Sequence, residues 1–209
     1  MTSTGTSGTT VLDPAALPPE QLFRLLTGSV VPRPIAWTST LSTGGVPNLA
    51  PFSFFTVVST VPPMLSLTVE AATGGGPKDT LRNIEDTGEF VVNSVSADVG
   101  DQMYESSLDH APQVSEFREA GVTPTPSTTV RPPRVAESKI SMECVLHQVL
   151  RPGSDALVIG TVVAFHVAEG LLSAAGHIDL HRLRPLGRVA ARFTDVRDPF
   201  LLPAQIAAR

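Results

Sequence analysis

The chain has 209 residues, of which 42 % are hydrophobic and 17 % are charged, a composition that supports one apolar core and excludes a disordered chain. Its 15 basic and 20 acidic residues give a formal net charge of −5, which disfavours nucleic acid as a partner. The single cysteine excludes an internal disulfide and a cysteine-rich metal site. No apolar run reaches the roughly 18 residues that span a bilayer. We therefore expect a cytoplasmic globular protein without a membrane segment.

Residues 1–13 begin with Ser, Thr and Gly almost exclusively, and we expect them to form a disordered tail before one domain at 14–209. Pro19 suits the first turn of a helix whose apolar stripe ends at Gly28. Alternating residues then predict a strand over 35–41, followed by a turn at Gly44-Gly45. A buried strand is expected over 54–58 and a half-buried one over 65–69.

A helix is expected to open at Lys78-Asp79-Thr80 and to end near Gly88, with a strand over 90–95 behind it. Short helices and loops follow over 97–121, and the Pro/Thr-rich stretch 123–133 predicts an extended surface connection. Two long strands around the turn at 151–155 predict a hairpin. This series of strands with few, short helices indicates an antiparallel β-barrel, because closure removes exposed edges.

Most candidate reactive groups are better explained as structure. His177 and His181 have the four-residue spacing of a metal pair, but the preceding Gly176 disfavours the helix that such a pair needs, so no metal site is expected. Cys144 lies on the apolar face of a predicted strand, where a free thiol behaves as a small buried hydrophobe. Nucleophile-elbow and P-loop motifs do not occur in the sequence.

The segment GGGPKDT (74–80) suits a phosphate group. Lys78 is one of only two lysines, and it precedes the expected helix together with Asp79 and Thr80. Free backbone N–H groups, the helix dipole, a hydroxyl and an ammonium group together favour an anion. The alternative is a surface loop in which Asp79 caps the helix.

The segment 33–63 combines many hydroxyl groups with irregular strand residues. Thr38, Ser39 and Thr40 lie on the predicted strand, and Asn48, Pro51 and Ser53 interrupt the next one. A proline within a strand indicates an edge or a bulge, which frees backbone N–H and C=O groups for a ligand. The alternative is a Thr-rich barrel strand with an ordinary bulge.

Several segments in this order resemble the flavin reductase-like flavoproteins, whose fold is the FMN-binding split β-barrel. The segments that carry the resemblance are RPIAWTSTLSTGGVPNLAPFSFF (33–55), VPPMLSLTV (61–69), KDTLRNIEDTGEFVVNSV (78–95), SEFREAGVTPTPS (115–127), RPPRVAESKISMECVLHQV (131–149), ALVIGTVV (156–163) and LRPLGRVAARF (183–193). They cover nearly the whole chain from about residue 20.

The resemblance implies a homodimer with one FMN per subunit near the interface, FAD being the alternative cofactor. It places Asn48, Ala50, Pro51, Phe52 and Ser53 along the flavin ring. It directs Trp37, Thr38, Ser39 and Thr40 toward the flavin, its ribityl chain or its phosphate, and Lys78, Asp79 and Thr80 to the phosphate. Because the flavin carries the redox chemistry, no catalytic side chain is expected.

Two departures from the family pattern bear on the reductant and the pocket. Short members often carry Gly-Asp-His before the strand at 157–160, whereas this chain has Gly153-Ser154-Asp155. An acidic group there disfavours an anionic dinucleotide, so NAD(P)H as the direct reductant is open. Ala190, Ala191 and Phe193 replace glycines and a tyrosine that longer members tend to have.

The resemblance therefore predicts an FMN-dependent oxidoreductase that reduces free flavin, for example for a partner monooxygenase, or reduces a small organic substrate. The alternatives are an electron carrier without turnover, a flavoenzyme with a donor other than NAD(P)H, and a barrel module without a cofactor. Neither the substrate nor the role of the loops over 97–133 follows from the sequence.

Overall fold

The computed structural model describes residues 8–72, 74–111 and 113–203. Part of the predicted disordered tail, residues 1–7, lies outside the described residues, as do residues 204–209 of the predicted domain. The helices are η1 (Pro14–Ala16), α1 (Pro19–Ser29), α2 (Asp79–Thr87), η2 (Ala97–Val99), α3 (Gly100–Glu105), α4 (Glu116–Glu119) and α5 (Leu180–Leu183). The strands are β1 (Ala36–Leu41), β2 (Pro47–Phe52), β3 (Phe55–Thr60), β4 (Pro63–Val69), β5 (Glu89–Ser94), β6 (Pro124–Thr125), β7 (Arg134–Val135), β8 (Ile140–Leu150), β9 (Ala156–Val167), β10 (Leu186–Val189) and β11 (Arg192–Asp195).

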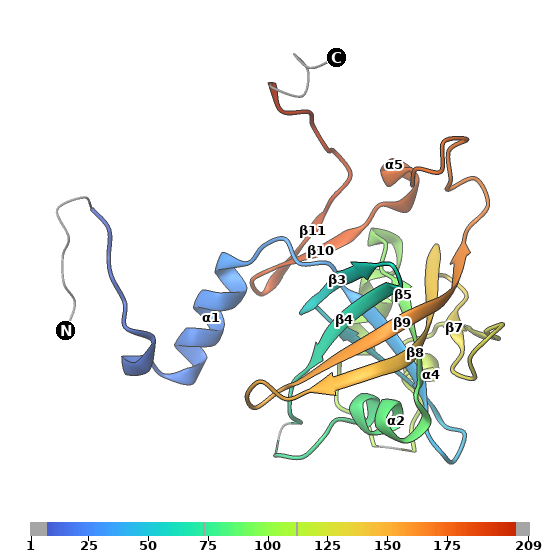
Figure 1. Cartoon of the computed structure of the whole chain (residues 1–209), viewed down its shortest axis with the longest axis horizontal. Helices are drawn as coiled ribbons and strands as arrows, with labels where there is room; N and C mark the ends of the chain where they lie inside the picture. Colours follow the sequence, from blue (N-terminus) through green and yellow to red (C-terminus); the bar gives the residue numbers. More distant parts are fainter. Residues whose placement is uncertain (1–7, 73, 112, 204–209) are drawn as a thin grey trace.

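Within the described residues, seven strands form one antiparallel sheet in the order β2-β1-β5-β8-β9-β4-β3 (Figure 1). The two edge strands, β2 and β3, are joined in sequence by only Ser53 and Phe54. So short a link requires the sheet to curl until its edges approach each other. No backbone ladder joins β2 to β3 in the described part of the chain, so the barrel is split along this seam.

Proline explains the position of β2 at an edge. Pro47 and Pro51 lack an N–H group, and an edge strand needs partners on one side only. The structure confirms the edge that Pro51 predicts. The hairpin predicted around the turn at 151–155 is also confirmed. Its strands β8 and β9 pair along most of their length, with irregularities at Glu143/Cys144 and Leu146/Gln148.

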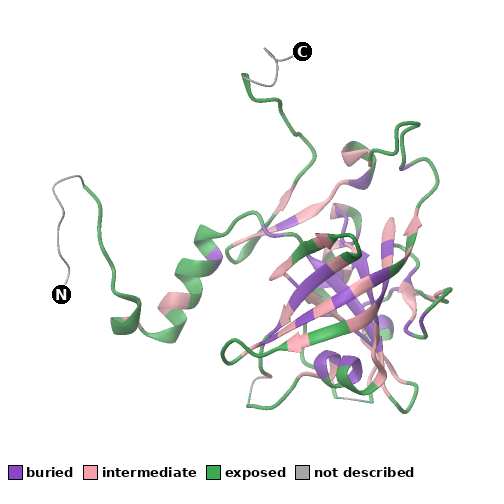
Figure 2. Ribbon diagram, in the orientation of Figure 1, coloured by how far each residue is buried: buried purple, intermediate pink, exposed green. Residues whose placement is uncertain are grey.

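The prediction of a buried strand over 54–58 is wrong in its burial. β3 forms at 55–60, but Val57 is 62 % exposed and Val58 is 47 % exposed. The strand is at the edge of the sheet, where it pairs with β4 on one side only and its side chains stay exposed (Figure 2). A run of β-branched residues predicts a strand but does not determine what covers it.

Two apolar clusters lie on opposite sides of β1, because successive strand residues point to opposite faces. Ala36 belongs to the cluster enclosed by the curled sheet, with Phe90 and Leu67, whereas Trp37 belongs to the cluster beneath α3 and α4. Gly160 permits the first cluster to form, since a Cβ atom there would lie 2.3 Å from Cζ of Phe90. The sheet is thus packed on both faces near β1.

Candidate functional site

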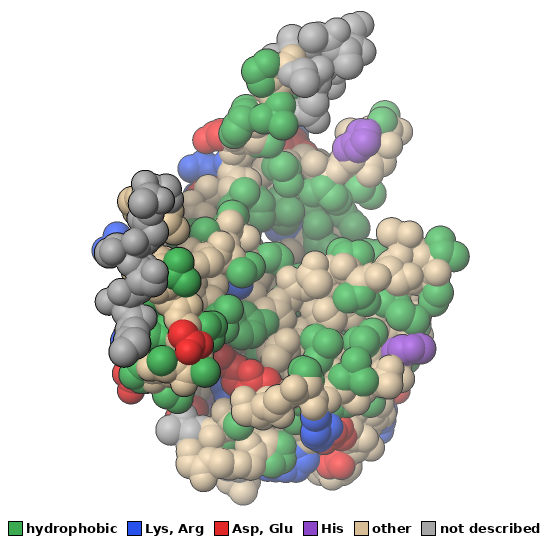
Figure 3. All heavy atoms as spheres, turned by 60° about the vertical axis from the view of Figure 1, so that its left-hand side comes forward, with side chains coloured by type: hydrophobic (Ala, Val, Ile, Leu, Met, Phe, Trp, Pro, Cys, Tyr) green, Lys and Arg blue, Asp and Glu red, His purple; other side chains and the backbone are tan. Residues whose placement is uncertain are grey.

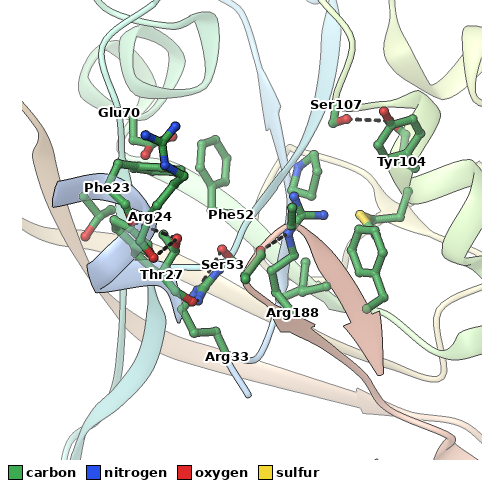
Figure 4. Close-up of a pocket in the computed structure, with 18 of the residues that line it drawn as sticks. Phe23, Arg24, Thr27, Arg33, Phe52, Ser53, Glu70, Tyr104, Ser107 and Arg188 are labelled. Atoms are coloured by element: carbon green, nitrogen blue, oxygen red, sulfur yellow. Dashed lines mark hydrogen bonds between the residues drawn. The ribbon is translucent and has the colours of Figure 1, made fainter. Parts of the chain in front are cut away.

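A cavity of about 470 Å³, termed the main cavity below, lies beside the link between β2 and β3 (Figure 4). It is bounded by α1, the approach to β1, the β2–β3 link, β4, the start of α2, α3 and the β10–β11 hairpin. The lining side chains are Phe23, Arg24, Thr27, Arg33, Ile35, Pro51, Phe52, Ser53, Phe54, Thr68, Glu70, Lys78, Met103, Tyr104, Ser107, Arg188, Ala190, Ala191 and Phe193. Its size and its mixture of aromatic and charged walls are those of a small-molecule site.

Four of the twelve residues predicted to bind a cofactor line this cavity: Pro51, Phe52, Ser53 and Lys78. The first three come from the end of β2 and the link to β3, where the strand leaves the sheet. Lys78 directly precedes α2 and has no ion-pair partner among the described residues. The topology thus brings together the two segments, 33–63 and 74–80, that the sequence singled out separately.

The start of α2 is suited to an anion. No side chain caps the helix, and the first intrahelical bond runs from Arg82 N to Lys78 O at 3.1 Å. The N–H groups of Asp79, Thr80 and Leu81 therefore have no acceptor within the described chain. The Asp79 side chain does not cap them, since its Oδ1 accepts from Arg82 Nη1 at 2.5 Å. Unpaired N–H groups and the helix dipole favour negative charge at this position.

The predicted residues of β1 are fully buried and have protein partners. Trp37 Nε1 donates to Ser106 Oγ at 2.9 Å, Ser39 Oγ donates to Pro133 O at 2.5 Å, and Thr38 Oγ1 donates to Ala36 O at 3.3 Å. All of these β1 side chains, with Thr40, are 0 % exposed. None of the four lines the main cavity within the described chain.

Asn48, Thr80, Thr40 and Asn83 continue this buried network. Asn48 Nδ2 donates to Thr80 Oγ1 at 2.9 Å, and Asn83 Nδ2 donates to Thr40 Oγ1 at 3.0 Å. These bonds attach α2 to β1 and β2, and so hold the start of α2 near the end of β2. Ala50 is half-buried on β2 and packs against the first apolar cluster.

Two arginines of the cavity were missed from the sequence. Arg33 begins the quoted segment at 33–55, and Arg188 lies in the segment at 183–193, yet neither was assigned a role. They are 155 positions apart but form an antiparallel bridge, which no local pattern could indicate. The one local signal is the proline after Arg33, which restricts Arg33 to an extended backbone just before the buried strand β1.

A second hollow adjoins the main cavity and shares Phe23, Arg24 and Glu70 with it. Asp155 and Glu20 also line this hollow, so three carboxylates face it together with one arginine. The acidic residue that departs from the family pattern is thus next to the main cavity. The local charge disfavours an anionic group in this hollow.

Glu143 is a fully buried carboxylate outside the cavity. Burial alone would raise its pKa, but three backbone N–H groups, at Thr128, Thr129 and Val130, and the His166 ring lower the pKa to about 2. The N···O distances from these backbone groups are 2.6–3.0 Å. This carboxylate fastens the predicted surface connection at 123–133 to β8.

Other reactive groups offer no second site. Cys144 is buried, and its desolvation together with the nearby Glu143 raises its pKa to about 12, so the thiol stays protonated. No group of three His, Cys, Asp or Glu side chains suited to a metal ion occurs in residues 8–72, 74–111 and 113–203. Over the same residues, no helix has the length and apolar character needed to cross a membrane.

A split antiparallel barrel with a cation-lined cavity at its seam defines a small-molecule binding protein of the split-barrel class. Residues 27–186 match the model of the flavin reductase like domain. The fold matches the crystal structure of nitrilotriacetate monooxygenase component B from Bacillus cereus, with a TM-score of 0.90, 34 % identity, and coverage of 94 % of this chain and 100 % of that one. It also matches 2-nitrobenzoate 2-nitroreductase NbaA of Pseudomonas fluorescens, with a TM-score of 0.84, 31 % identity, and coverage of 92 % and 95 %.

An uncharacterized protein of Aquifex aeolicus is 38 % identical over 174 residues, which are 83 % of this chain and 89 % of that protein. The family match covers most of the chain, and these relatives extend over nearly its full length. The chain belongs to the flavin reductase-like family, with a mostly antiparallel split-barrel fold and a flavin-related redox or flavin-binding role.

Proposed function

We propose that the protein binds FMN in the main cavity and acts as a flavin-dependent oxidoreductase. The observation that carries the proposal is the convergence of Lys78, the uncapped start of α2 and the 51–53 segment on one cavity of about 470 Å³. An ammonium group and helix N–H groups suit a phosphate, and the aromatic ring of Phe52 beside the Ser53 hydroxyl suits a polar heterocycle. The residues present therefore fit FMN.

Each part of the cavity has a separate task in this proposal. Lys78 and the backbone N–H groups of Asp79 and Thr80 hold the phosphate. Pro51, Phe52 and Ser53 position the ring, and the buried network of Trp37, Thr38, Ser39, Thr40 and Asn48 keeps these two segments in register. When bound, the flavin supplies the electron-transfer chemistry, so the protein needs only to bind, orient and shield it.

A homodimer is part of the proposal, because large apolar side chains are exposed on segments that extend from the sheet. Phe23 and Leu26 on α1 are 51 % and 62 % exposed, Val61 after β3 is 90 % exposed, and Phe200 is 82 % exposed. Figure 3 shows hydrophobic side chains scattered over the face that carries α1. A second copy that covers these segments would remove them from water and cover the cavity that α1 borders.

The first experiment is an absorption spectrum of the purified protein, followed under anaerobic conditions as NADH and then NADPH are added. A flavin spectrum that bleaches within the mixing time identifies a reductase. A flavin spectrum that neither nicotinamide changes shows that the protein binds flavin but is not reduced by NADH or NADPH. The protein is then an electron carrier, or an enzyme with another electron donor. A colourless protein that takes up no FMN refutes the proposal.

A second experiment tests the phosphate site. Lys78→Ala should weaken FMN binding about tenfold and leave riboflavin binding nearly unchanged, because riboflavin lacks the phosphate. Lys139→Ala is the matched control, since its ammonium group contacts Asp98 and the 182 carbonyl instead of the cavity. Equal loss of both ligands in Lys78→Ala would contradict the assignment of the phosphate, but not flavin binding itself.

The acidic second hollow favours the carrier alternative. A dinucleotide that approaches the main cavity past Asp155 and Glu70 meets like charge, which slows its association. Nitrilotriacetate monooxygenase component B, to which the chain is similar, works beside a second component by its name. If the nicotinamides fail in the first experiment, a redox protein or a flavin-dependent monooxygenase is the partner to test, with the cytoplasm as the expected compartment.

A further inference from the structure

Two arginines are held side by side in the main cavity. Arg33 N donates to Arg188 O at 2.9 Å, and Arg188 N donates to Arg33 O at 2.8 Å. Each guanidinium lies over an aromatic ring: Cζ of Arg33 is 5.7 Å from the Phe54 centroid, and Cζ of Arg188 is 4.4 Å from the Phe193 centroid. Figure 4 shows both arginines at the cavity wall beside Ser53. The backbone and the rings thus fix the pair.

Arg33 is only 6 % exposed and forms no ion pair within the described chain. Its Nη1 donates to the carbonyls of Thr27 and Val30 at 2.5 and 2.9 Å, and its Nε donates to Ser53 Oγ at 3.3 Å. These bonds explain a structural role at the end of α1, where carbonyls lack intrahelical partners. They do not engage Nη2, for which the described residues provide no acceptor.

Arg188 is only partly buried, and it also forms no ion pair within the described chain. Its Nε donates to Ala190 O at 3.2 Å, and its two terminal nitrogens have no acceptor in the described part of the chain. Burial lowers the pKa of Arg33, the neighbouring Arg188 lowers it further, and Glu70 opposes this. A buried cation without an ion-pair partner, such as Arg33, is rare in proteins, because desolvation is costly unless an anion compensates it.

The charge lining the cavity differs from that of the whole chain. Four cationic side chains, from Arg24, Arg33, Lys78 and Arg188, face it with one carboxylate, Glu70, whereas the chain as a whole carries −5. Lys78 is next to the start of α2, where the proposed phosphate binds. The arginine pair is on the other boundary, formed by the β10–β11 hairpin and the approach to β1. Glu70 offsets part of its charge, but no carboxylate of the described residues forms an ion pair with it.

We propose that Arg33 and Arg188 together bind the carboxylate of a small planar organic acid, which is the substrate class of this enzyme. This rests on the proposed function. The two terminal nitrogens of Arg188 can donate in parallel to the two oxygens of a carboxylate, and Nη2 of Arg33 adds a further donor. Phe54, Phe193 and Tyr104 provide aromatic walls for a flat apolar body beside the pair. A dinucleotide fits less well, because the adjoining hollow is acidic.

Benzoate and benzamide are the probes, since they share shape and differ in charge. Calorimetric titration of the FMN-loaded protein should give a dissociation constant for benzoate at least about tenfold lower than for benzamide. Arg188→Gln should remove most of this preference, while it keeps the backbone bridge and the bonds of Arg33. Arg192→Gln is the matched control, because Arg192 is exposed on the same hairpin and does not line the cavity.

Three outcomes distinguish failure of the carboxylate site from failure of FMN binding. Equal binding of benzoate and benzamide to the FMN-loaded protein refutes the carboxylate site and leaves the proposed function intact. A variant Arg188→Gln that weakens FMN but not riboflavin assigns the pair to the cofactor phosphate, which also refutes the carboxylate site. Failure of the wild-type protein to take up FMN refutes the proposed function itself.

Discussion

The buried network around β1 and the main cavity are both rich in polar side chains, but they differ in how these side chains are paired. In the network, Ser39, Thr40, Asn48 and Asn93 each meet a protein donor or acceptor within 3.3 Å. In the cavity, the arginine pair and Lys78 retain donors that no described residue accepts. A satisfied buried polar group stabilises the fold, whereas an unsatisfied one at a cavity indicates a ligand.

The largest loss of stability is expected at Asn93, in the centre of the buried network. Asn93 Nδ2 donates to Trp37 O and Ser39 Oγ, and its Oδ1 accepts from Val135 N and Ser141 Oγ. Asn93→Ala leaves these buried groups without partners and should lower the free energy of unfolding by about 4 kcal/mol. Urea denaturation measures the loss. A loss below about 1 kcal/mol would mean that water replaces the amide, and that this region is not the dry network described.

The second effect concerns pH and the carboxylate of Glu143. Its pKa is lowered from 4.5 to about 2, so the folded state binds its proton more weakly than the unfolded state. The stabilisation, about 3 kcal/mol, is complete above pH 4.5 and is lost as the pH falls toward 2. Unfolding free energies over this range measure it. Glu143→Gln should flatten this part of the profile, and an unchanged slope in that variant would assign the acid sensitivity to other carboxylates.

The third effect distinguishes network from cavity at a single residue. Thr80 provides an Oγ1 acceptor to Asn48 and also a free backbone N–H group at the start of α2. Thr80→Val removes the hydroxyl and keeps the N–H group. We expect a loss of about 1–2 kcal/mol in stability with an unchanged ratio of FMN to riboflavin affinity. A selective loss of FMN affinity in this variant would show that the Thr80 hydroxyl contacts the phosphate.

The smallest effect concerns backbone strain at the cavity wall. Ala190 has φ of 48°, a left-handed conformation that favours glycine. Ala190→Gly should raise the free energy of unfolding by about 0.5 kcal/mol, because the relief of strain slightly exceeds the added entropy of the unfolded chain. Thermal unfolding measures the gain. Ala191→Gly is the matched control, and the same gain in both variants would exclude strain at Ala190 as the cause.

Local patterns determined most of the elements and two parts of the site. Apolar alternation predicted β1, β4 and the strands of the β8–β9 hairpin, since strand periodicity depends on neighbouring residues only. The strand expected over 90–95 forms as β5. The glycines before Lys78 predicted the start of α2, and Pro51 predicted an edge strand. The resemblance of the ordered segments predicted the family and the split barrel, which the comparisons confirm.

Tertiary structure alone decided which polar residues are satisfied within the protein and which face a cavity. Trp37, Thr38, Ser39 and Thr40 look in sequence like ligand-binding residues, but their partners come from positions 36, 83, 106 and 133. The exposure of β3 and the pairing of Arg33 with Arg188 also depend on contacts between distant segments. The physical reason is that a sequence pattern records the preference of each residue for burial or water, whereas satisfaction of a hydrogen bond depends on a second group that only the folded chain supplies.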